Sequence, residues 1–457
     1  MGGVTLLVYR EKGGVVFVEL KTFDARIPEG YAAFREAASR RRSGFPEDVL
    51  DAARDIVERV RRDGDRALCE FTRRFDNVAL EPDAIEIPQA TFEDVRATAD
   101  EALVEALERA AARIYEFHAR DLPDSFTYHD DLGNELGVRV VPVDRAGCYV
   151  PGGQAAYPST VLMTVLPAKA AGVSEIVVCV PPDRSGSIHP ATLLALAIAR
   201  PDRVFRVGGA QAIAAMAYGT ETIPACDVIV GPGNIYVAAA KKLVQGDVAI
   251  DMIAGPSEVA IVADDSVDPV WLALDAMAQA EHDPRAASYL ITPFEEVAVN
   301  FRDALEAQLK DALRKDTIRA SLESNGAIVL VSDLEQAIDV ANLLAPEHLE
   351  LAVADPEPLL RRVRSAGAVF LGALTAESFG DYVLGPNHTL PTQGTARFAS
   401  PLSARAFLKE INVLSVSEAG LKTLYEPLAR IAEAEGLLAH RDAARVRYEA
   451  LSRGDAR

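Results

Sequence analysis

The sequence predicts an α/β protein with two incomplete Rossmann-like domains built on parallel sheets, plus small N-terminal and C-terminal helical segments. Three observations predict this fold. Short β-branched runs alternate with helical stretches from about residue 138 to residue 345, the pattern of parallel βαβ units. Glycine-rich turns follow several of these strands. The stretches 46–118 and 417–457 contain charged amphipathic helices and few strand signals.

The elements follow in order along the chain. Residues 46–118 read as amphipathic helices, with Gly64 as a helix stop. Strands and helices then alternate through "GVRVVPV", "PSTVLMTVLPAKAAGV", "EIVVCVPP", "PATLLALAIARP", "RVFRVGG", "AQAIAAMAYG", "DVIVGPG" and "NIYVAAAKKLV". The alternation resumes with "SEVAIVA", "ASYLIT", "GAIVLV" and "DLEQAIDVANLLA". Two α/β units are therefore expected. The helical end of the chain could pack on a neighbouring subunit.

Composition excludes several classes of protein. The 457 residues are 49% hydrophobic, but charge, proline or glycine interrupts the apolar runs well short of the ~20 residues of a membrane helix. The net charge of −21 argues against nucleic acid as a partner. The four cysteines lie far apart without CxxC spacing, which argues against a thiolate zinc site and a disulfide framework. A cytoplasmic location is the expectation, with no membrane partner.

Three glycine-rich turns lie where a predicted strand gives way to a helix: residues 150–158, 206–212 and 229–237. Open α/β sheets bind ligands at such positions, although a single turn needs glycine for steric reasons alone. Three turns in one unit favour a bound nucleotide or phosphate. Tyr149, Gln211 and Asn234 are the candidates for stacking on it and hydrogen bonding to it, and each could equally be an ordinary loop residue.

The stretch "DPVWLALDAMAQAEHDP" reads as a buried helix that ends on Gln279 and His282. Residues three apart share a helix face, so both side chains could point at one atom. The pair is either half of a metal site or an ordinary polar helix end.

Glu347 and His348 follow Pro346 in "LLAPEHLEL". Neighbouring residues can serve one site in a turn or at a helix start, and the proline supplies that irregularity. A carboxylate and an imidazole together can activate water and move protons near neutral pH. The alternative is a Glu-His pair in a surface turn.

Further candidates for a site lie toward the C-terminus: Asp381, His388, Glu435 and His440. Together with Gln279 and His282 they include enough donors to supply two imidazoles, a carboxylate and an amide oxygen to a four-coordinate site. Such a set suits zinc, and cobalt or manganese also fit. No spacing rule connects residues this far apart in the sequence.

Long motifs give the chain a resemblance to a known family. "GCYVPGG", "RVGGAQAIAAMAYGTETIP", "VGPGNIYVAAAK", "DMIAGPSEV", "QAEHD", "APEHLEL", "ESFGDYVLGPNHTLPT" and "GLLAH" together resemble histidinol dehydrogenases, in this order and from about Pro46 onward. The resemblance implies an NAD-dependent four-electron oxidation of L-histidinol to L-histidine through L-histidinal, in the last steps of histidine biosynthesis. It also implies one Zn²⁺ per subunit and a homodimer with shared active sites.

The resemblance assigns roles residue by residue. Metal ligands would be Gln279, His282, Asp381 and, from the partner subunit, His440. NAD contacts would be Tyr149, Gln211 and Asn234. Glu347 and His348 would form the catalytic pair, with His348 as general base and Glu347 activating water. Histidinol would be bound by the catalytic pair and the metal ligands together with Ser257, His388 and Glu435.

The resemblance also suggests a division into domains. Residues 1–45 would be an N-terminal extension and helical arm. Residues 46–149 with 258–401 would form the first α/β domain, carrying most of the metal and catalytic site, and residues 150–257 the second, carrying the NAD loops. Residues 402–457 would be a C-terminal helical dimerisation segment.

Three other functions compete with this reading. A paralogous NAD-dependent dehydrogenase could oxidise another amino alcohol or polyol with the same machinery. A zinc hydrolase could use Glu347 without redox chemistry, but the three glycine-rich turns argue against it. A silent binding protein is disfavoured by the intact Glu347-His348 pair.

Overall fold

The computed structural model of the chain describes residues 18–41, 44–152 and 156–453. The chain divides into two compact units: residues 1–121 with 144–407, and residues 122–143 with 408–457. Part of the expected N-terminal extension, residues 1–17, and part of the first glycine-rich turn, residues 153–155, lie outside the described residues. The two units are described separately below. No helix in the described part of the chain is long and apolar enough to span a membrane.

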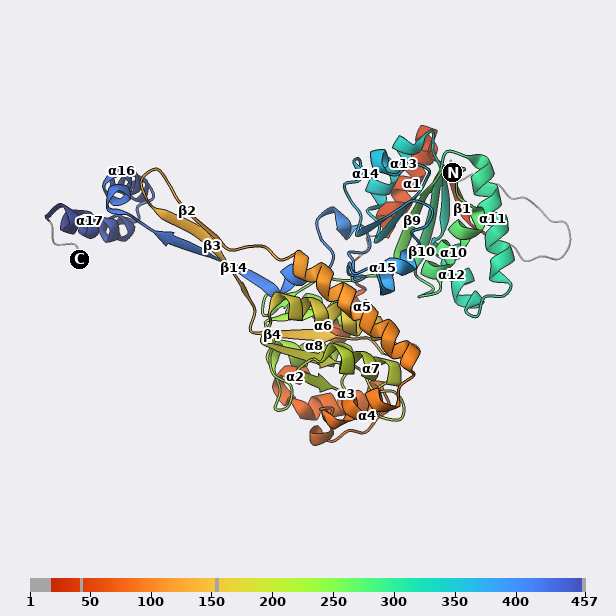
Figure 1. The fold of residues 1–457 in the computed structure, drawn as a ribbon, viewed down its shortest axis with the longest axis horizontal. Helices are drawn as coiled ribbons and strands as arrows, with labels where there is room; N and C mark the ends of the chain where they lie inside the picture. The colour runs from red at the N-terminus through yellow and green to blue at the C-terminus, as the bar shows by residue number, and fades with distance from the viewer. Residues whose placement is uncertain (1–17, 42–43, 153–155, 454–457) are drawn as a thin grey trace. The chain divides into compact units, whose positions relative to one another are not determined.

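The first unit contains a six-stranded parallel sheet (Figure 1) with the order β1-β11-β10-β9-β12-β13. Its strands are β1 (Lys21–Asp24), β9 (Glu258–Ala263), β10 (Ala287–Thr292), β11 (Ala327–Leu330), β12 (His348–Ala352) and β13 (Ala368–Leu371). The four strands β9 to β12 are buried along their whole length, as expected for parallel strands covered on both faces.

Helices cover both faces of this sheet. One apolar layer involves α10 (Pro269–Ala280), α11 (Glu295–Leu309) and α12 (Lys315–Asn325). The other involves α1 (Pro28–Arg40), α13 (Leu334–Leu344) and α14 (Glu357–Leu360). The short helix α15 (Glu377–Tyr382) follows β13. Residues 18–40, expected as an extension and helical arm, instead supply an edge strand and a covering helix, because β1 pairs with β11.

The first unit also contains a five-stranded parallel sheet with the order β6-β5-β4-β7-β8. Its strands are β4 (Arg145–Tyr149), β5 (Glu175–Cys179), β6 (Arg203–Phe205), β7 (Val228–Val230) and β8 (Ala249–Ile250). The first strand, β4, lies between β5 and β7, so the winding direction reverses there. Such a reversal opens a crevice at the carboxyl ends of the two strands.

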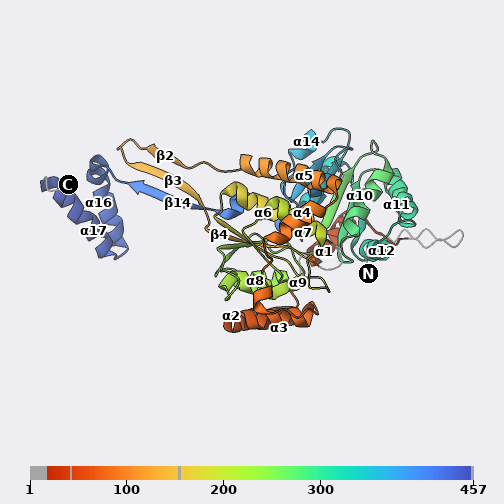
Figure 2. The ribbon, with the colours of Figure 1, turned by 60° about the horizontal axis from the view of Figure 1, so that its bottom comes forward.

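Two layers of helices lie on each side of the five-stranded sheet (Figure 2). The helices α8 (Gly209–Tyr218) and α9 (Ile235–Val244) pack with α2 (Glu47–Asp63) and α3 (Asp65–Phe75). On the other side, α6 (Pro158–Ala171) and α7 (Pro190–Ala199) pack with α4 (Ala90–Thr98) and α5 (Glu101–Arg120). The expected stop at Gly64 is the end of α2, with φ at 54°.

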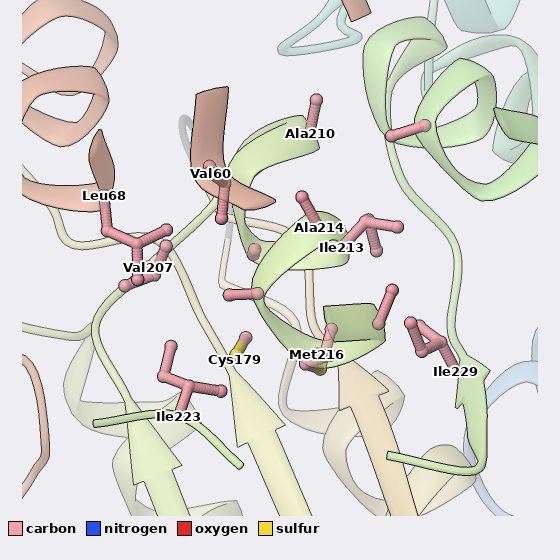
Figure 3. Packing of buried hydrophobic residues seen from close by; sticks show 14 of the residues in the cluster. Val60, Leu68, Cys179, Val207, Ala210, Ile213, Ala214, Met216, Ile223 and Ile229 are labelled. Carbon is pink, nitrogen blue, oxygen red and sulfur yellow. The ribbon is translucent and has the colours of Figure 1, made fainter. Parts of the chain in front are cut away.

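The helices before residue 121 therefore belong with the five-stranded sheet and not, as the domain division expected, with residues 258–401. Figure 3 shows the reason: Leu68 of α3 lies against Val207, just before α8, and Val60 of α2 belongs to the same apolar cluster as Ile213 and Ala214 of α8. Apolar faces of helices bury themselves against whatever apolar layer lies next to them. This choice of partner leaves no local signal in the sequence.

The second unit is an antiparallel three-stranded sheet followed by two helices. The strand order is β14-β3-β2, with β2 (Phe126–His129), β3 (Glu135–Pro142) and β14 (Leu408–Ser415). The helices are α16 (Glu418–Ala434) and α17 (Leu438–Arg453), which pack on each other. "GVRVVPV", expected to start the parallel units, thus belongs to an antiparallel sheet. The expected helical segment 402–457 includes the strand β14, and its first residues, up to Phe407, belong to the first unit.

Candidate functional site

The glycine-rich turns at 206–212 and 229–237 lie at the carboxyl ends of β6 and β7, and Tyr149 is the last residue of β4. Tyr149 is buried in the apolar cluster, and its hydroxyl accepts a hydrogen bond from the backbone N–H of Gly209 at 3.0 Å. Oε1 of Gln211 is buried without a hydrogen-bond partner among the described residues. Asn234 caps α9, its Oδ1 accepting from the N–H groups of Tyr236 and Val237. The structure thus brings the three predicted NAD contacts to one edge of the sheet.

A buried ion pair holds the loop after β7. Nζ of Lys241 donates to Oδ1 of Asp251 and, at 3.0 Å, to the carbonyl of Gly231. The N–H of Gly231 donates to Oδ2 of Asp251 at 2.8 Å. Gly231 has φ at +115°, and a Cβ there would lie 2.1 Å from the carbonyl oxygen of Tyr149, so this position requires glycine. The sequence interpretation missed this ion pair because its residues lie ten apart with no motif.

The predicted catalytic pair lies at the opposite edge of the other sheet. His348 is the first residue of β12, Glu347 precedes it, and Ser257 and Glu258 stand at the start of the neighbouring strand β9. These are amino ends of strands, not the turn or helix start that the sequence suggested. Oε2 of Glu347 accepts a hydrogen bond from the backbone N–H of Glu258 at 3.0 Å, so the start of β9 fixes the carboxylate.

Carboxylates surround the imidazole of His348. Its Nδ1 lies 3.9 Å from Oε2 of Glu347 and 3.8 Å from Oε1 of Glu377, and its Nε2 lies 3.6 Å from Oδ1 of Asp381. His348, Glu347 and Glu377 are all at least 94% buried, with exposed fractions of 4%, 6% and 2%. Glu377 was not predicted, although it lies four residues before Asp381 on α15, a spacing that places both on one helix face.

Burial and charge shift the protonation equilibria of this cluster. Burial raises the pKa of Glu347 to about 7, partly opposed by the His348 imidazole. Burial alone would lower the pKa of His348, but the carboxylates of Glu377, Glu347 and Asp381 outweigh it and raise the pKa well above its usual value. A carboxyl group that titrates near neutral pH and a basic imidazole suit general acid and base work.

The predicted metal ligands lie partly together. Gln279 is buried in the last turn of α10, and the N–H of the exposed His282 donates to its carbonyl at 3.3 Å. Burial disfavours the charged form of Asp381, but the imidazoles of His348, His388 and His282 lower its pKa. Among the described residues, one group of His and carboxylate ligand atoms lies within 4.8 Å of one another: His348, Glu377 and Asp381.

The predicted ligands Gln279, His282 and Asp381 fit a zinc ion, since they offer an amide oxygen, an imidazole nitrogen and a carboxylate oxygen. Nε2 of His348 also makes no hydrogen bond to any residue that the structure describes. Gln279, His282 and Asp381 belong to the first unit, whereas His440, on α17, and Glu435, at the end of α16, are exposed residues of the second.

His388 completes the polar wall of the site. Its Nδ1 lies 3.0 Å from the carbonyl oxygen of Asp381 and its Nε2 lies 3.4 Å from Oγ1 of Thr160, so it joins α15 to α6. A cavity of about 500 Å³ adjoins it and is lined, among others, by His118, His348, Phe370, Asp381 and His388. The cavity gives a small polar molecule room beside the imidazole of His348.

Comparisons with known proteins agree with this geometry. The family model described as Histidinol dehydrogenase matches residues 39–448. The chain is 50% identical to the histidinol dehydrogenase of Aquifex aeolicus, over 90% of this chain and 95% of that protein. It is 47% identical to that of Chlorobium luteolum, over 96% and 98%. The solved histidinol dehydrogenase of Elizabethkingia anophelis superposes with a TM-score of 0.90 at 36% identity, covering 95% of this chain and 99% of that one.

These matches run through both units and both sheets, so they cover the predicted catalytic pair and the glycine-rich turns alike. The family consists of oxidoreductases that use NAD and zinc to oxidise histidinol to histidine in histidine biosynthesis. The expected resemblance is confirmed: the chain belongs to the histidinol dehydrogenase family.

Proposed function

We propose that this chain oxidises L-histidinol to L-histidine by way of a bound aldehyde, with His348 as the base in both oxidations and Glu347 as the group that activates water. The observation that carries the proposal is the position of His348 at the start of β12, where Nδ1 faces two carboxylates, Nε2 faces Asp381 and the residue lines the cavity. The glycine-rich turns at the carboxyl edge of the five-stranded sheet support an oxidation that uses NAD, because open α/β sheets bind dinucleotides at this edge.

The mechanism uses these residues in sequence. Gln279, His282, Asp381 and the partner subunit's His440 would hold the zinc ion, which when bound supplies a fixed positive charge that orients the substrate. His348 accepts the hydroxyl proton as hydride passes to the first NAD⁺. As water adds to the aldehyde, Glu347 takes a proton from the water and protonated His348 returns its proton to the aldehyde oxygen, which gives the hydrate. The neutral His348 then accepts a hydroxyl proton of the hydrate as hydride passes to the second NAD⁺. A pKa of about 7 for Glu347 matches this task at neutral pH.

The remaining site residues would bind the substrate or the dinucleotide. Ser257 lies at the start of β9, beside the catalytic pair, and would contact histidinol together with His388 and the partner subunit's Glu435. Tyr149, Gln211 and Asn234 would contact NAD. A cytoplasmic location and the absence of a nucleic-acid partner remain predictions from the sequence.

The decisive experiment counts NADH formed per L-histidinol consumed by the purified protein with zinc and NAD⁺. Two NADH per histidinol, lost on chelation and in His348→Ala, is the expected result. One NADH would mean that the aldehyde escapes and that the role of Glu347 is wrong. If no NADH formed, the fold would stand, but the protein would be a dehydrogenase of another amino alcohol or polyol, or a zinc hydrolase.

We also propose a homodimer in which each site takes Glu435 and His440 from the partner. Large apolar side chains of the second unit are exposed: Ile411, Leu414, Val416, Leu424, Leu428, Ile431, Leu437, Leu438 and Val446. An exposed apolar surface of this kind marks an interface.

The shared site can be tested by mixing two inactive variants, His348→Ala and His440→Ala, under conditions that exchange subunits. Each hybrid dimer would have one intact site, so about one quarter of the wild-type activity should return if subunits pair at random. No recovery, in a mixture shown to contain hybrids, would place His440 in its own subunit's site.

A further inference from the structure

Glu377 is a buried carboxylate that the proposed function does not use. It is the first residue of α15 and only 2% exposed. Burying a carboxylate is costly unless other groups pair with it or donate hydrogen bonds to it. The partners of Glu377 therefore indicate what this residue does.

Two functional residues from different elements meet on this one carboxylate. Oε1 of Glu377 lies 3.8 Å from Nδ1 of His348, which begins β12. The amide of Gln279, on α10, donates from its nitrogen to Oε2 at 3.0 Å and to Oε1 at 2.5 Å when it is oriented to satisfy its hydrogen bonds. The carboxylate thus connects the proposed base with a proposed metal ligand.

A third contact holds Glu377 itself. Its backbone N–H donates to Oε1 of Glu350, on β12, at 3.1 Å. Glu350 is 3% exposed and lies two residues after His348 on the same strand, so both side chains point to the same face of the sheet. Strand β12 therefore fixes the start of α15 over the imidazole.

Each contact selects one atom for chemistry. When the raised pKa of His348 has been overcome and the imidazole is in its neutral form, as a base must be, a proton kept on Nδ1, toward a carboxylate, leaves the lone pair on Nε2. An amide whose nitrogen is bound to a carboxylate leaves its oxygen as the atom that can bind a metal. In both cases Glu377 would decide which atom faces the reaction.

We propose that Glu377 is a positioning residue that fixes the tautomer of His348 and the amide orientation of Gln279 together. The inference rests on the proposed function. It extends that function because one carboxylate, that of Glu377, would orient both a metal ligand, Gln279, and the base, His348. The competing possibility is that Glu377 is a metal ligand, since its carboxylate lies within 4.8 Å of ligand atoms of His348 and Asp381.

The test uses Glu377→Gln in the full-length enzyme. One carbonyl oxygen cannot accept both N–H bonds of Gln279 and face Nδ1 of His348 as well. We expect kcat for histidinol to fall about 10²–10⁴-fold, as when the orienting carboxylate of a catalytic triad becomes an amide, with KM changed less than about threefold. We expect the zinc dissociation constant, measured by competition with a chelator, to rise about 10–100-fold. Glu377→Asp should recover part of both.

Glu350→Gln is the matched control, because it also replaces a buried carboxylate on this face with an amide. Its carbonyl oxygen can still accept the N–H of residue 377, so kcat and the zinc dissociation constant should stay within about threefold of wild type. If Glu350→Gln lost as much as Glu377→Gln, removal of any buried carboxylate would explain both, and the proposal would be overturned.

The cobalt-substituted enzyme separates positioning from ligation. If Glu377 only positions, the visible spectrum of Glu377→Gln at saturating Co²⁺ should keep its bands, because the ligand set is unchanged. Altered bands in Glu377→Gln would make Glu377 a metal ligand, and weaker zinc binding in His348→Gln would make His348 one. Either result would overturn the proposal. The measurements of zinc affinity and of the cobalt spectrum need no histidinol, so they still test the role of Glu377 if the wild-type enzyme forms no NADH from histidinol. Wild-type kcat and zinc affinity in Glu377→Gln would also overturn it.

Discussion

The two parallel sheets of the first unit share a winding pattern but carry their proposed functional residues at opposite edges. In each, the first strand of its run lies between the second and the fourth: β4 between β5 and β7, and β9 between β10 and β12. The glycine-rich turns occupy the carboxyl edge of the five-stranded sheet. Ser257, Glu347 and His348 occupy the amino edge of the six-stranded sheet.

The two edges also differ in buried charge. The carboxyl edge of the five-stranded sheet offers backbone amides and one internally neutralised ion pair, Lys241 with Asp251. The amino edge of the six-stranded sheet buries Glu258, Glu347 and His348, with Glu377 beside them. A dinucleotide can be held by backbone N–H groups without buried titratable groups, whereas proton transfer needs titratable groups in a water-poor site. The rule that open α/β sheets bind ligands at the carboxyl ends of their strands therefore fits the glycine-rich turns of the five-stranded sheet. It does not fit the cluster around His348 at the amino edge of the six-stranded sheet.

The largest expected effect comes from His348→Gln, which removes the proposed base and leaves the five-stranded sheet untouched. We expect kcat for histidinol to fall about 10²–10⁴-fold, measured as the initial rate of NADH formation. The dissociation constant for NAD⁺, measured by calorimetry, should change by less than about twofold, because the substitution does not touch the glycine-rich turns. A comparable loss of NAD⁺ binding would show that the two edges are not independent and would break the comparison.

Next in size is Lys241→Met, which leaves Asp251 buried without its cation. Breaking a buried pair from one side costs about 3–5 kcal/mol, so the free energy of unfolding in urea should fall by that amount. The matched control is Arg430→Met, which breaks the exposed i,i+4 pair with Glu426 and should cost about 0.3–0.5 kcal/mol. Equal losses in the two variants would mean that the loop after β7 does not depend on the buried pair.

The sequence predicted the local parts of this comparison. Hydrophobic periodicity and turn-forming residues were enough to predict β9, β10 and α10, the end of a helix at Gly64 and the glycine-rich turns. Each of these signals lies within a few residues of sequence. The segments "APEHLEL" and "ESFGD" contain four of the carboxyl groups around His348, but only Glu347 and Asp381 among them were predicted as site residues.

Contacts between distant segments were not predictable in this way. Glu258 reaches Glu347 across 89 residues, and Lys241 holds Gly231 through Asp251. The pairing of β3 with β14 joins residues more than 260 apart, so "GVRVVPV" looked like the start of a parallel unit. Periodicity shows that a segment buries one face but not what covers it, which also explains the misplaced helices before residue 121.

The smallest expected effect sharpens the contrast by comparing two buried imidazoles. His348 has carboxylates around it, which raise its pKa well above the usual value. His118, on α5, is 0% exposed, and its ring nitrogens have no hydrogen-bond partner in the described part of the chain. Burial lowers its pKa to about 4, and Asp121 opposes this only weakly.

The sign of the pH effect follows from this shift. Unfolded His118, with a pKa near 6.5, binds a proton between about pH 6.5 and pH 4, while folded His118 does not. The folded state therefore loses stability as the pH falls through this window, by up to about 3 kcal/mol. His118→Leu keeps an apolar side chain of similar size and should remove this part of the acid destabilisation. Urea unfolding at pH 7 and pH 5 would measure it, and the difference between pH 8 and pH 7 should be the same in both proteins. If the variant lost as much stability in acid as wild type, His118 would be charged in the folded protein, and carboxylates would not be what distinguishes the two imidazoles.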